Sequence, residues 1–124
     1  MRQVTFVFGA LCLGFGIAAI VSAGGDDEEK KAKHTIKQVM KEAHKDKLLN
    51  KVVEGDASKE EKDNLLDLYI SLLENKPKKG DEDSWHIKAG TLVVAAAKVS
   101  VGRDGAEMEL KKAADCGACH KMHK

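Results

Sequence analysis

The chain reads Cys-Gly-Ala-Cys-His at residues 116–120, within its last nine residues. This C-x-x-C-H spacing is the one by which haem is attached covalently to protein. Two thiols on adjacent turns of a helix can each form a thioether to one vinyl group of the same porphyrin. The histidine beside the second thiol then reaches the iron through its neutral imidazole. The segment predicts haem c bound through Cys116 and Cys119, with His120 as an axial ligand to the iron.

Zinc sites and redox-active or disulfide-bonded thiol pairs also use a C-x-x-C spacing. A structural zinc site needs a second pair of ligands, but His86 stands alone and His123 belongs to the same short tail. Thioredoxin-like thiol pairs stand at the start of a helix that follows a strand, and nothing before Cys116 reads as a strand. The pattern favours haem over these alternatives, which the sequence leaves open.

The amino-terminal segment is apolar, because residues 4–23 contain no charge and follow a single basic residue, Arg2. Small residues at 21–23 fit a signal-peptidase site. We therefore expect residues 1–23 to be a signal peptide, which agrees with haem c because this haem is attached outside the bacterial cytoplasmic membrane. An uncleaved anchor is the alternative, since a stretch of this length can cross a bilayer. The expected location is the periplasm or another exported compartment, with membrane attachment only if the segment is retained.

Charge and aromatic content argue against nucleic acid as a partner. Removal of residues 1–23 takes away Arg2 alone among the charged residues and leaves 20 basic residues against 20 acidic ones. The remaining chain has no basic field, and its aromatic residues are limited to Tyr69 and Trp85. Nucleic-acid-binding proteins need one or both of these features.

Helical spacing of apolar residues begins after a charged run at residues 24–33, which we expect to be a flexible leader. Helices are expected over residues 34–53, 58 to about 73, 81 to about 101, and 104–124. Four helices joined by short connections predict an all-α, up-down-up-down four-helix bundle over residues 34–124. The covalently attached haem would then lie near the carboxyl end of the chain.

Capping signals support these boundaries. Ser58 with Glu61, and Asp104 with Glu107, have the spacing of capping boxes, and Gly55 is expected to end the first helix. The expected core residues are Ile36, Val39, Met40, Ala43, Leu48, Leu49, Val52, Val53, Leu65, Leu66, Tyr69, Leu72, Leu73, Trp85, Ala89, Leu92, Val93, Ala96, Val99, Leu110, Ala113 and Ala114.

An exported chain with four expected helices and C-x-x-C-H at the end of the last one resembles the class II c-type cytochromes, of which the cytochrome c-prime group is the best known. In specific residues the resemblance rests on Cys116, Cys119 and His120. Class I cytochromes c carry this motif near the amino terminus instead. The resemblance implies that the residue facing the haem from the first helix is either a methionine, giving a six-coordinate electron carrier, or an apolar residue, giving an open site. Homodimers through the first two helices are common in that family.

Met40 is the expected sixth ligand to the iron. In an up-down bundle the start of the first helix lies beside the end of the last, which puts Met40 and His120 at similar depth on facing helices. Met40 also lies on the apolar stripe, so the alternative is that it fills a gap in the core. His44, one turn later, and His34, at the start of the helix, are less favoured because a histidine on a helix surface is more often solvated.

The remaining histidines and the nearby lysines carry weaker expectations. His86 and His123 are poorer candidates as ligands, and His123 is expected to be exposed at a fraying terminus. Lys37, Lys41 and Lys121 could pair with haem propionates, although a solvated surface position is the favoured interpretation for each of them.

Two functions follow from the number of iron ligands. Six-coordinate haem would make the chain an electron-transfer protein, and five-coordinate haem would make it a binder of nitric oxide or carbon monoxide. We expect electron transfer because Met40 stands where a ligand would. Catalysis such as peroxide reduction would need an acid–base group, for example His44, but nothing in the sequence requires an enzyme. The expected partners are redox proteins, with weak long-range steering because the chain is nearly neutral.

Overall fold

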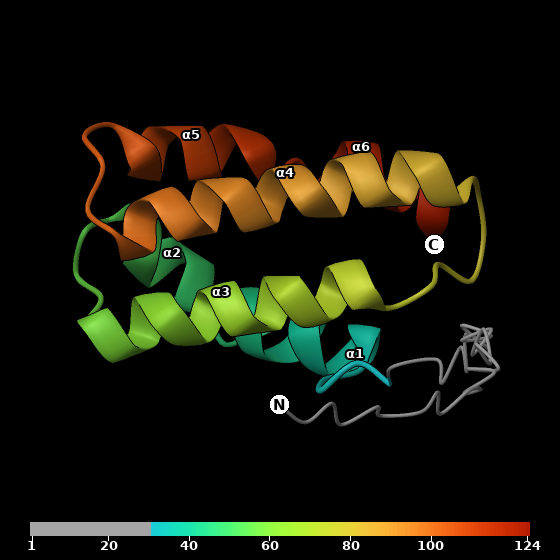
Figure 1. Ribbon diagram of the computed structural model, residues 1–124, viewed down its shortest axis with the longest axis horizontal. Helices are drawn as coiled ribbons and strands as arrows, with labels where there is room; N and C mark the ends of the chain where they lie inside the picture. Colours follow the sequence, from blue (N-terminus) through green and yellow to red (C-terminus); the bar gives the residue numbers. More distant parts are fainter. Residues whose placement is uncertain (1–30) are drawn as a thin grey trace, which may run out of the picture.

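The computed structural model describes residues 31–124, which over that range form helices and loops without a strand (Figure 1). The expected signal peptide and all but the last three residues of the expected leader lie outside the described residues. No helix within residues 31–124 is long and apolar enough to cross a membrane.

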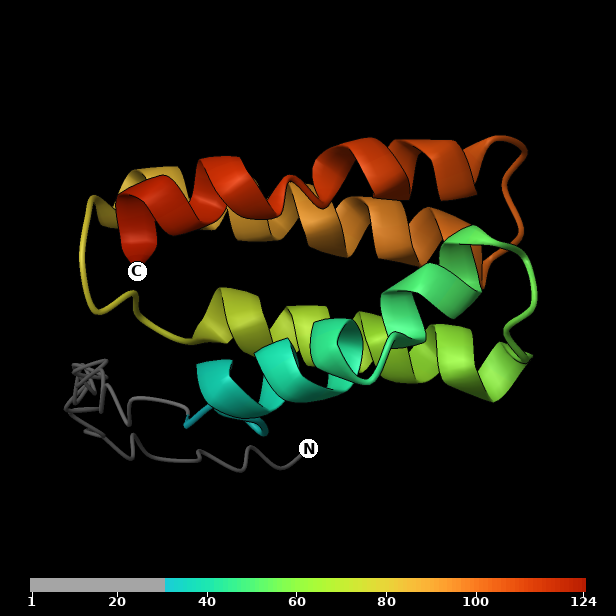
Figure 2. The same cartoon turned by 180° about the vertical axis from the view of Figure 1, so that it is seen from behind.

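Seven helical elements follow one another along the described chain and are arranged as four limbs. They are α1 (Ile36–Val39), the π-helix η1 (Met40–Lys45), α2 (Leu48–Val53), α3 (Lys59–Glu74), α4 (Glu82–Ser100), α5 (Ala106–Ala113) and α6 (Cys116–His123). The first three form one limb and the last two another. Figure 2 shows each limb running back along the one before it, so the expected all-α bundle of four limbs is what the chain forms.

The first limb is not the continuous helix that the sequence analysis expected over residues 34–53. Its middle turns are π-helical, with the amide of Asp46 donating to the carbonyl of Lys41 five residues earlier at 2.8 Å. Lys47 then adopts a left-handed conformation with φ of 63°, which no helix interior accommodates. These two features bend the limb and separate η1 from α2.

The fourth limb, expected as one helix over residues 104–124, is also broken. Ala114 leaves the helical region with ψ of 50°, and the Asp115 carboxylate accepts a hydrogen bond from the amide of Ala118 at 2.9 Å. An aspartate in this position starts a new helix, so Cys116 becomes the first residue of α6. The expected capping box of Asp104 and Glu107 is wrong, because Gly105 occupies the cap of α5 and no side chain caps it.

Elsewhere the local signals worked as expected. The Ser58 hydroxyl accepts from the Glu61 amide at 3.2 Å, and the Glu61 carboxylate accepts from the Ser58 amide at 2.8 Å, which completes a capping box at the start of α3. A second capping box, which was not predicted, is formed by Thr35 and Gln38 at the start of α1.

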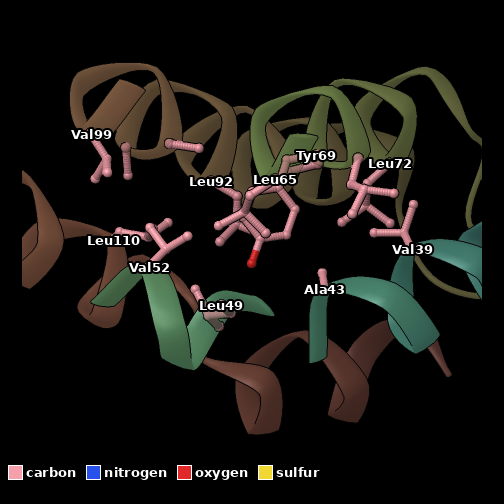
Figure 3. Packing of buried hydrophobic residues seen from close by; sticks show 14 of the residues in the cluster. Val39, Ala43, Leu49, Val52, Leu65, Tyr69, Leu72, Leu92, Val99 and Leu110 are labelled. Atoms are coloured by element: carbon pink, nitrogen blue, oxygen red, sulfur yellow. The ribbon is translucent and has the colours of Figure 1, made fainter. Parts of the chain in front are cut away.

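The core is formed by residues from all four limbs (Figure 3). All the expected core residues are buried or pack against the buried cluster, and Leu68, Ala95 and Ala106 are buried in addition. Leu68 was missed because α3 is covered by α4 on one side and by α1 and α2 on another. Its buried face is therefore wider than a single stripe.

The two ends of the bundle differ. At one end, here called the closed end, α2 packs against α5 and completes the ring of four limbs. At the other, here called the open end, α6 packs against α4, and two cavities lie between α6 and the α1–η1 segment. The C-x-x-C-H segment is at the open end.

Candidate functional site

The two thiols of the motif lie on a short helix that begins at the first of them. Cys116 is exposed, Cys119 is half-buried, and both are free thiols. The Cys116 thiol lies 3.6 Å from the carbonyl oxygen of Ala114, to which it donates. Both cysteines and His120 line a cavity at the open end, so α6 presents the whole motif to one space.

The first cavity has a volume of about 670 Å³ and lies between η1, α4, α5 and α6. Besides the motif, its lining includes Met40 and His44 from η1 and the small residues Ala113, Ala114 and Ala118. These alanines leave room beside α6 that larger side chains would fill. The volume falls within the range of about 300–1,000 Å³ that is usual for sites of small molecules and cofactors.

A second cavity, of about 770 Å³, adjoins the first. Met40, Cys119 and His120 line both of them. The second cavity extends toward α1 and the start of α4, where Ile36 and Trp85 form part of its wall. The structure therefore brings the expected sixth ligand and the expected axial histidine to the same place, where the two cavities meet.

Met40 is the first residue of η1, is half-buried and packs against the core cluster. Short π-helical segments are rare and are often found at functional sites. Met40 and His44, four residues apart on η1, line the same cavity.

His44 is half-buried and contacts Tyr69, with 6.0 Å between the ring centroids. Burial, and to a lesser extent the charge of His120, lower the pKa of the His44 imidazole below its ordinary value. The neutral ring is therefore favoured, and it keeps a nitrogen lone pair available inside the cavity.

The other histidines lie elsewhere. Nε2 of His34 is 3.3 Å from Oδ2 of Asp67 on α3, and His34 lines neither cavity. His86 is exposed on α4 and is also absent from both linings. The expectation that His123 is exposed is wrong: it is buried, because the end of α6 docks on the loop between α3 and α4.

Two buried polar atoms have no hydrogen-bond partner among the described residues, one on Trp85, which lines the second cavity, and one on Tyr69, which lines neither cavity but contacts His44. They are the Tyr69 hydroxyl and the Trp85 indole nitrogen. Burial, followed by the charge of Cys116, raises the pKa of Tyr69 well above its usual range, so the hydroxyl keeps its proton. Figure 3 shows this hydroxyl pointing away from α3, toward the space between Leu49 and Ala43. Buried donors are nearly always paired in native proteins, so the orphaned indole nitrogen of Trp85 fits a site that takes up a further group with acceptor atoms.

Some of the lysines near the cavities, which could neutralise carboxylates of a bound group such as haem, were predicted from the sequence and others were not. Lys37 lines the second cavity, whereas Lys41 and Lys121 line neither. Lys88 lines the first cavity and acts electrostatically on Cys119. Sequence reasoning missed Lys88 because it lies on α4, far from the motif along the chain, and no local pattern distinguishes it from the many other lysines.

The alternatives to haem gain little from this geometry. Burial, the dominant influence, raises the pKa of the Cys119 thiol, whereas redox-active pairs have a lowered thiol pKa. No group of three or more His, Cys, Asp or Glu side chains suited to a metal ion occurs within residues 31–124. Haem needs no such cluster, since the porphyrin supplies four ligands to its iron.

No protein-family model, no curated protein and no solved structure matches the chain. Its function is therefore argued from the site alone.

Proposed function

We propose that this chain is an exported c-type cytochrome that transfers electrons through haem c. Cys116 and Cys119 hold the porphyrin by thioethers, and His120 is an axial ligand to the iron. The proposal is supported by the C-x-x-C-H spacing, by the cavities onto which this segment opens, and by the orphaned indole nitrogen of Trp85, which lines the second cavity.

The observation that carries electron transfer is the position of Met40. It lines both cavities together with Cys119 and His120, where a thioether can serve as the sixth ligand. A bound haem supplies one-electron chemistry, and ligation by methionine and histidine raises its reduction potential. His120 and Met40 would hold the iron, and apolar side chains such as Leu72 and Leu92 surround the site.

A second function, the binding of nitric oxide or carbon monoxide at five-coordinate iron, is favoured by one observation. The first cavity extends beyond Met40 to His44 and Leu72, so a small ligand has room if Met40 does not ligate. His44, which lines this cavity, would then be a side chain that can hydrogen-bond to the ligand. We place this function second because it leaves the position of Met40 unexplained.

The partners of the electron carrier would be redox proteins outside the cytoplasm. Lys45, Lys88 and Lys112 line the first cavity and Lys37 the second, which gives the site a locally positive rim on a nearly neutral chain. Such a rim orients an encounter at short range with an acidic surface. Membrane attachment and a homodimer both remain compatible with this proposal.

Covalent attachment is tested first, by producing the full chain in a bacterium that matures c-type cytochromes. We expect haem to stay with the chain after denaturation and to add its mass to a peptide containing Cys116 and Cys119. The Cys116→Ala/Cys119→Ala variant should lose it. A wild-type chain without covalent haem would end the proposal.

Ligation is tested next, by optical and resonance Raman spectra of the ferric and ferrous protein. We expect low-spin iron in the wild type and high-spin iron in Met40→Ala. Met108→Ala is the matched control, because Met108 is an exposed methionine on α5 that lines neither cavity. High-spin iron in the wild type, with avid binding of carbon monoxide, would favour the gas-binding function instead.

A further inference from the structure

The end of α6 contacts the bundle through His123, which is buried, and through the sulfur of Met122, which lies 4.0 Å from the Ser84 hydroxyl. His123 is the one buried residue of this eight-residue helix, with 7 % of its surface exposed. Every other residue of α6 is exposed or half-buried. A short helix of this kind has little packing of its own, so its position depends on whatever anchors it.

Both ring nitrogens of His123 lie within hydrogen-bond distance of the segment that leads from α3 into α4. Nδ1 of His123 lies 3.0 Å from the carbonyl oxygen of Lys79, in the loop between α3 and α4. A carbonyl only accepts, so Nδ1 carries the proton and donates. Nε2 lies 3.3 Å from the hydroxyl oxygen of Ser84, in the first turn of α4, and accepts from it in the neutral ring.

Packing around the ring is equally close. The Trp85 and His123 rings meet edge to face, with 5.4 Å between centroids and 78° between planes. Gly80 has φ of 86°, and a Cβ there would lie 2.5 Å from the backbone oxygen of Met122 and 2.7 Å from Nδ1 of His123. A glycine is therefore required both by the turn and by the approach of α6.

We infer that His123 is a positioning residue that holds the C-x-x-C-H helix against α4 and, one turn away, sets the place of His120. The effect on the iron rests on the proposed function, because it requires bound haem with His120 as a ligand. His123 also lines the second cavity, together with Trp85 and His120, so the same contacts close the end of the site nearest the carboxyl terminus. We call the contacts of His123 with Lys79, Ser84 and Trp85 the latch. The latch holds the C-x-x-C-H helix in a fixed position at the edge of the second cavity.

The first test is hydrogen exchange, read by mass spectrometry on the full chain, because it does not depend on haem. In His123→Ala we expect amides of residues 116–123 to exchange about tenfold faster, the factor expected when hydrogen bonds of ordinary strength are lost. Alkylation of the half-buried Cys119 in any haem-free fraction should accelerate with them. Amides of α3 should be unchanged. Exchange in α6 at the wild-type rate would overturn the inference, and so would an equal rise throughout α3 and α4, which would mean general destabilisation.

The second test reads the iron. In haem-loaded His123→Ala we expect part of the low-spin iron to become high-spin, or, if the iron is five-coordinate, the iron–histidine stretching band to shift and broaden. His123→Asn keeps a donor for the Lys79 carbonyl and should restore most of the wild-type spectrum. His86→Ala, which removes an exposed histidine from α4, is the matched control. Loosened α6 amides with an unchanged spectrum would mean that His123 does not position His120.

The two tests separate the inference from the proposed function. If the chain takes up no haem, the proposed function fails, while exchange and alkylation still decide whether His123 positions the motif. If His123→Ala does not fold, Ser84→Ala removes one contact of the latch alone and should accelerate exchange in α6 by a smaller factor, with an unchanged rate overturning the inference.

Discussion

The closed and open ends of the bundle are made from similar lengths of helix, but they are filled differently. At the closed end Val52, Val99 and Leu110, each at most 1 % exposed, face one another between α2, α4 and α5 (Figure 3). At the open end Val39 and Leu72 are also buried, but the half-buried Met40 and His44 border two cavities instead of a filled core. Branched apolar side chains therefore fill the closed end, where they stabilise the fold, whereas a methionine and a histidine lie beside the motif at the open end.

The largest difference between the ends should appear in stability. In a Cys116→Ala/Cys119→Ala background, which cannot attach haem, we expect Leu110→Ala to lower the free energy of unfolding by about 3 kcal/mol, because it opens a void in a packed core. Met40→Ala in the same background should cost about 1 kcal/mol, because its side chain already borders a cavity. Denaturant unfolding followed by circular dichroism measures both. Equal losses would show that the open end is packed as tightly as the closed one.

The helices were predicted from the sequence more completely than the breaks within them. Apolar spacing located all four limbs, because a buried helix face repeats every three or four residues wherever it packs. The breaks at Lys47 and Asp115 were missed for different reasons. A lysine in the left-handed region has no local signal, since tertiary contacts impose it. Asp115, in contrast, is a common helix cap. The break there was not predicted because the motif was expected to continue a single helix.

Within the site, the sequence predicted the candidate ligands, and the structure shows what surrounds them. Cys116, Cys119, His120 and Met40 were expected from spacing, and they do line a common cavity. The sequence did not predict that Lys88 lines the same cavity, that His123 lines the second one or that Tyr69 contacts His44, because these places depend on how α3 and α4 pack in the bundle. Of the two histidines predicted to be poorer candidates as ligands, His86 is exposed as a surface residue, whereas His123 is buried and lines the second cavity.

A smaller effect is expected from the caps that begin a limb at each end. Ser58→Ala removes one side of the capping box of α3 at the closed end and should lower the free energy of unfolding by about 1 kcal/mol. Thr35→Ala does the same to α1 at the open end, but it should cost less in global unfolding because this four-residue helix can fray on its own. The same denaturant measurement compares them. A larger loss for Thr35→Ala would mean that the open end is part of the cooperative unit.

The open end should also confer a pH dependence that the closed end does not. The pKa of His44 lies below its ordinary value of 6.5 in the folded chain, so the unfolded chain binds more protons between the two values. The contribution of His44 is then fully present above pH 6.5 and is lost as the pH falls through its lower, folded value. Haem-free wild type should lose stability over that window, and His44→Gln should lose less, with His120 of α6 and Lys45 of η1 as the charged neighbours in both. Coinciding profiles would show that His44 is solvated.

The smallest effect belongs to the ion pair that joins the limbs at the closed end. Nζ of Lys98 on α4 lies 2.6 Å from a carboxylate oxygen of Glu109 on α5, and both side chains are about half exposed. Water and salt screen such pairs, so Lys98→Ala should change the free energy of unfolding by about 0.5 kcal/mol at most. A double-mutant cycle with Glu109→Ala, measured at low and high salt, isolates the pair. A coupling several times larger, and insensitive to salt, would mean that charge rather than apolar packing closes this end, and the contrast between the two ends would need a different physical basis.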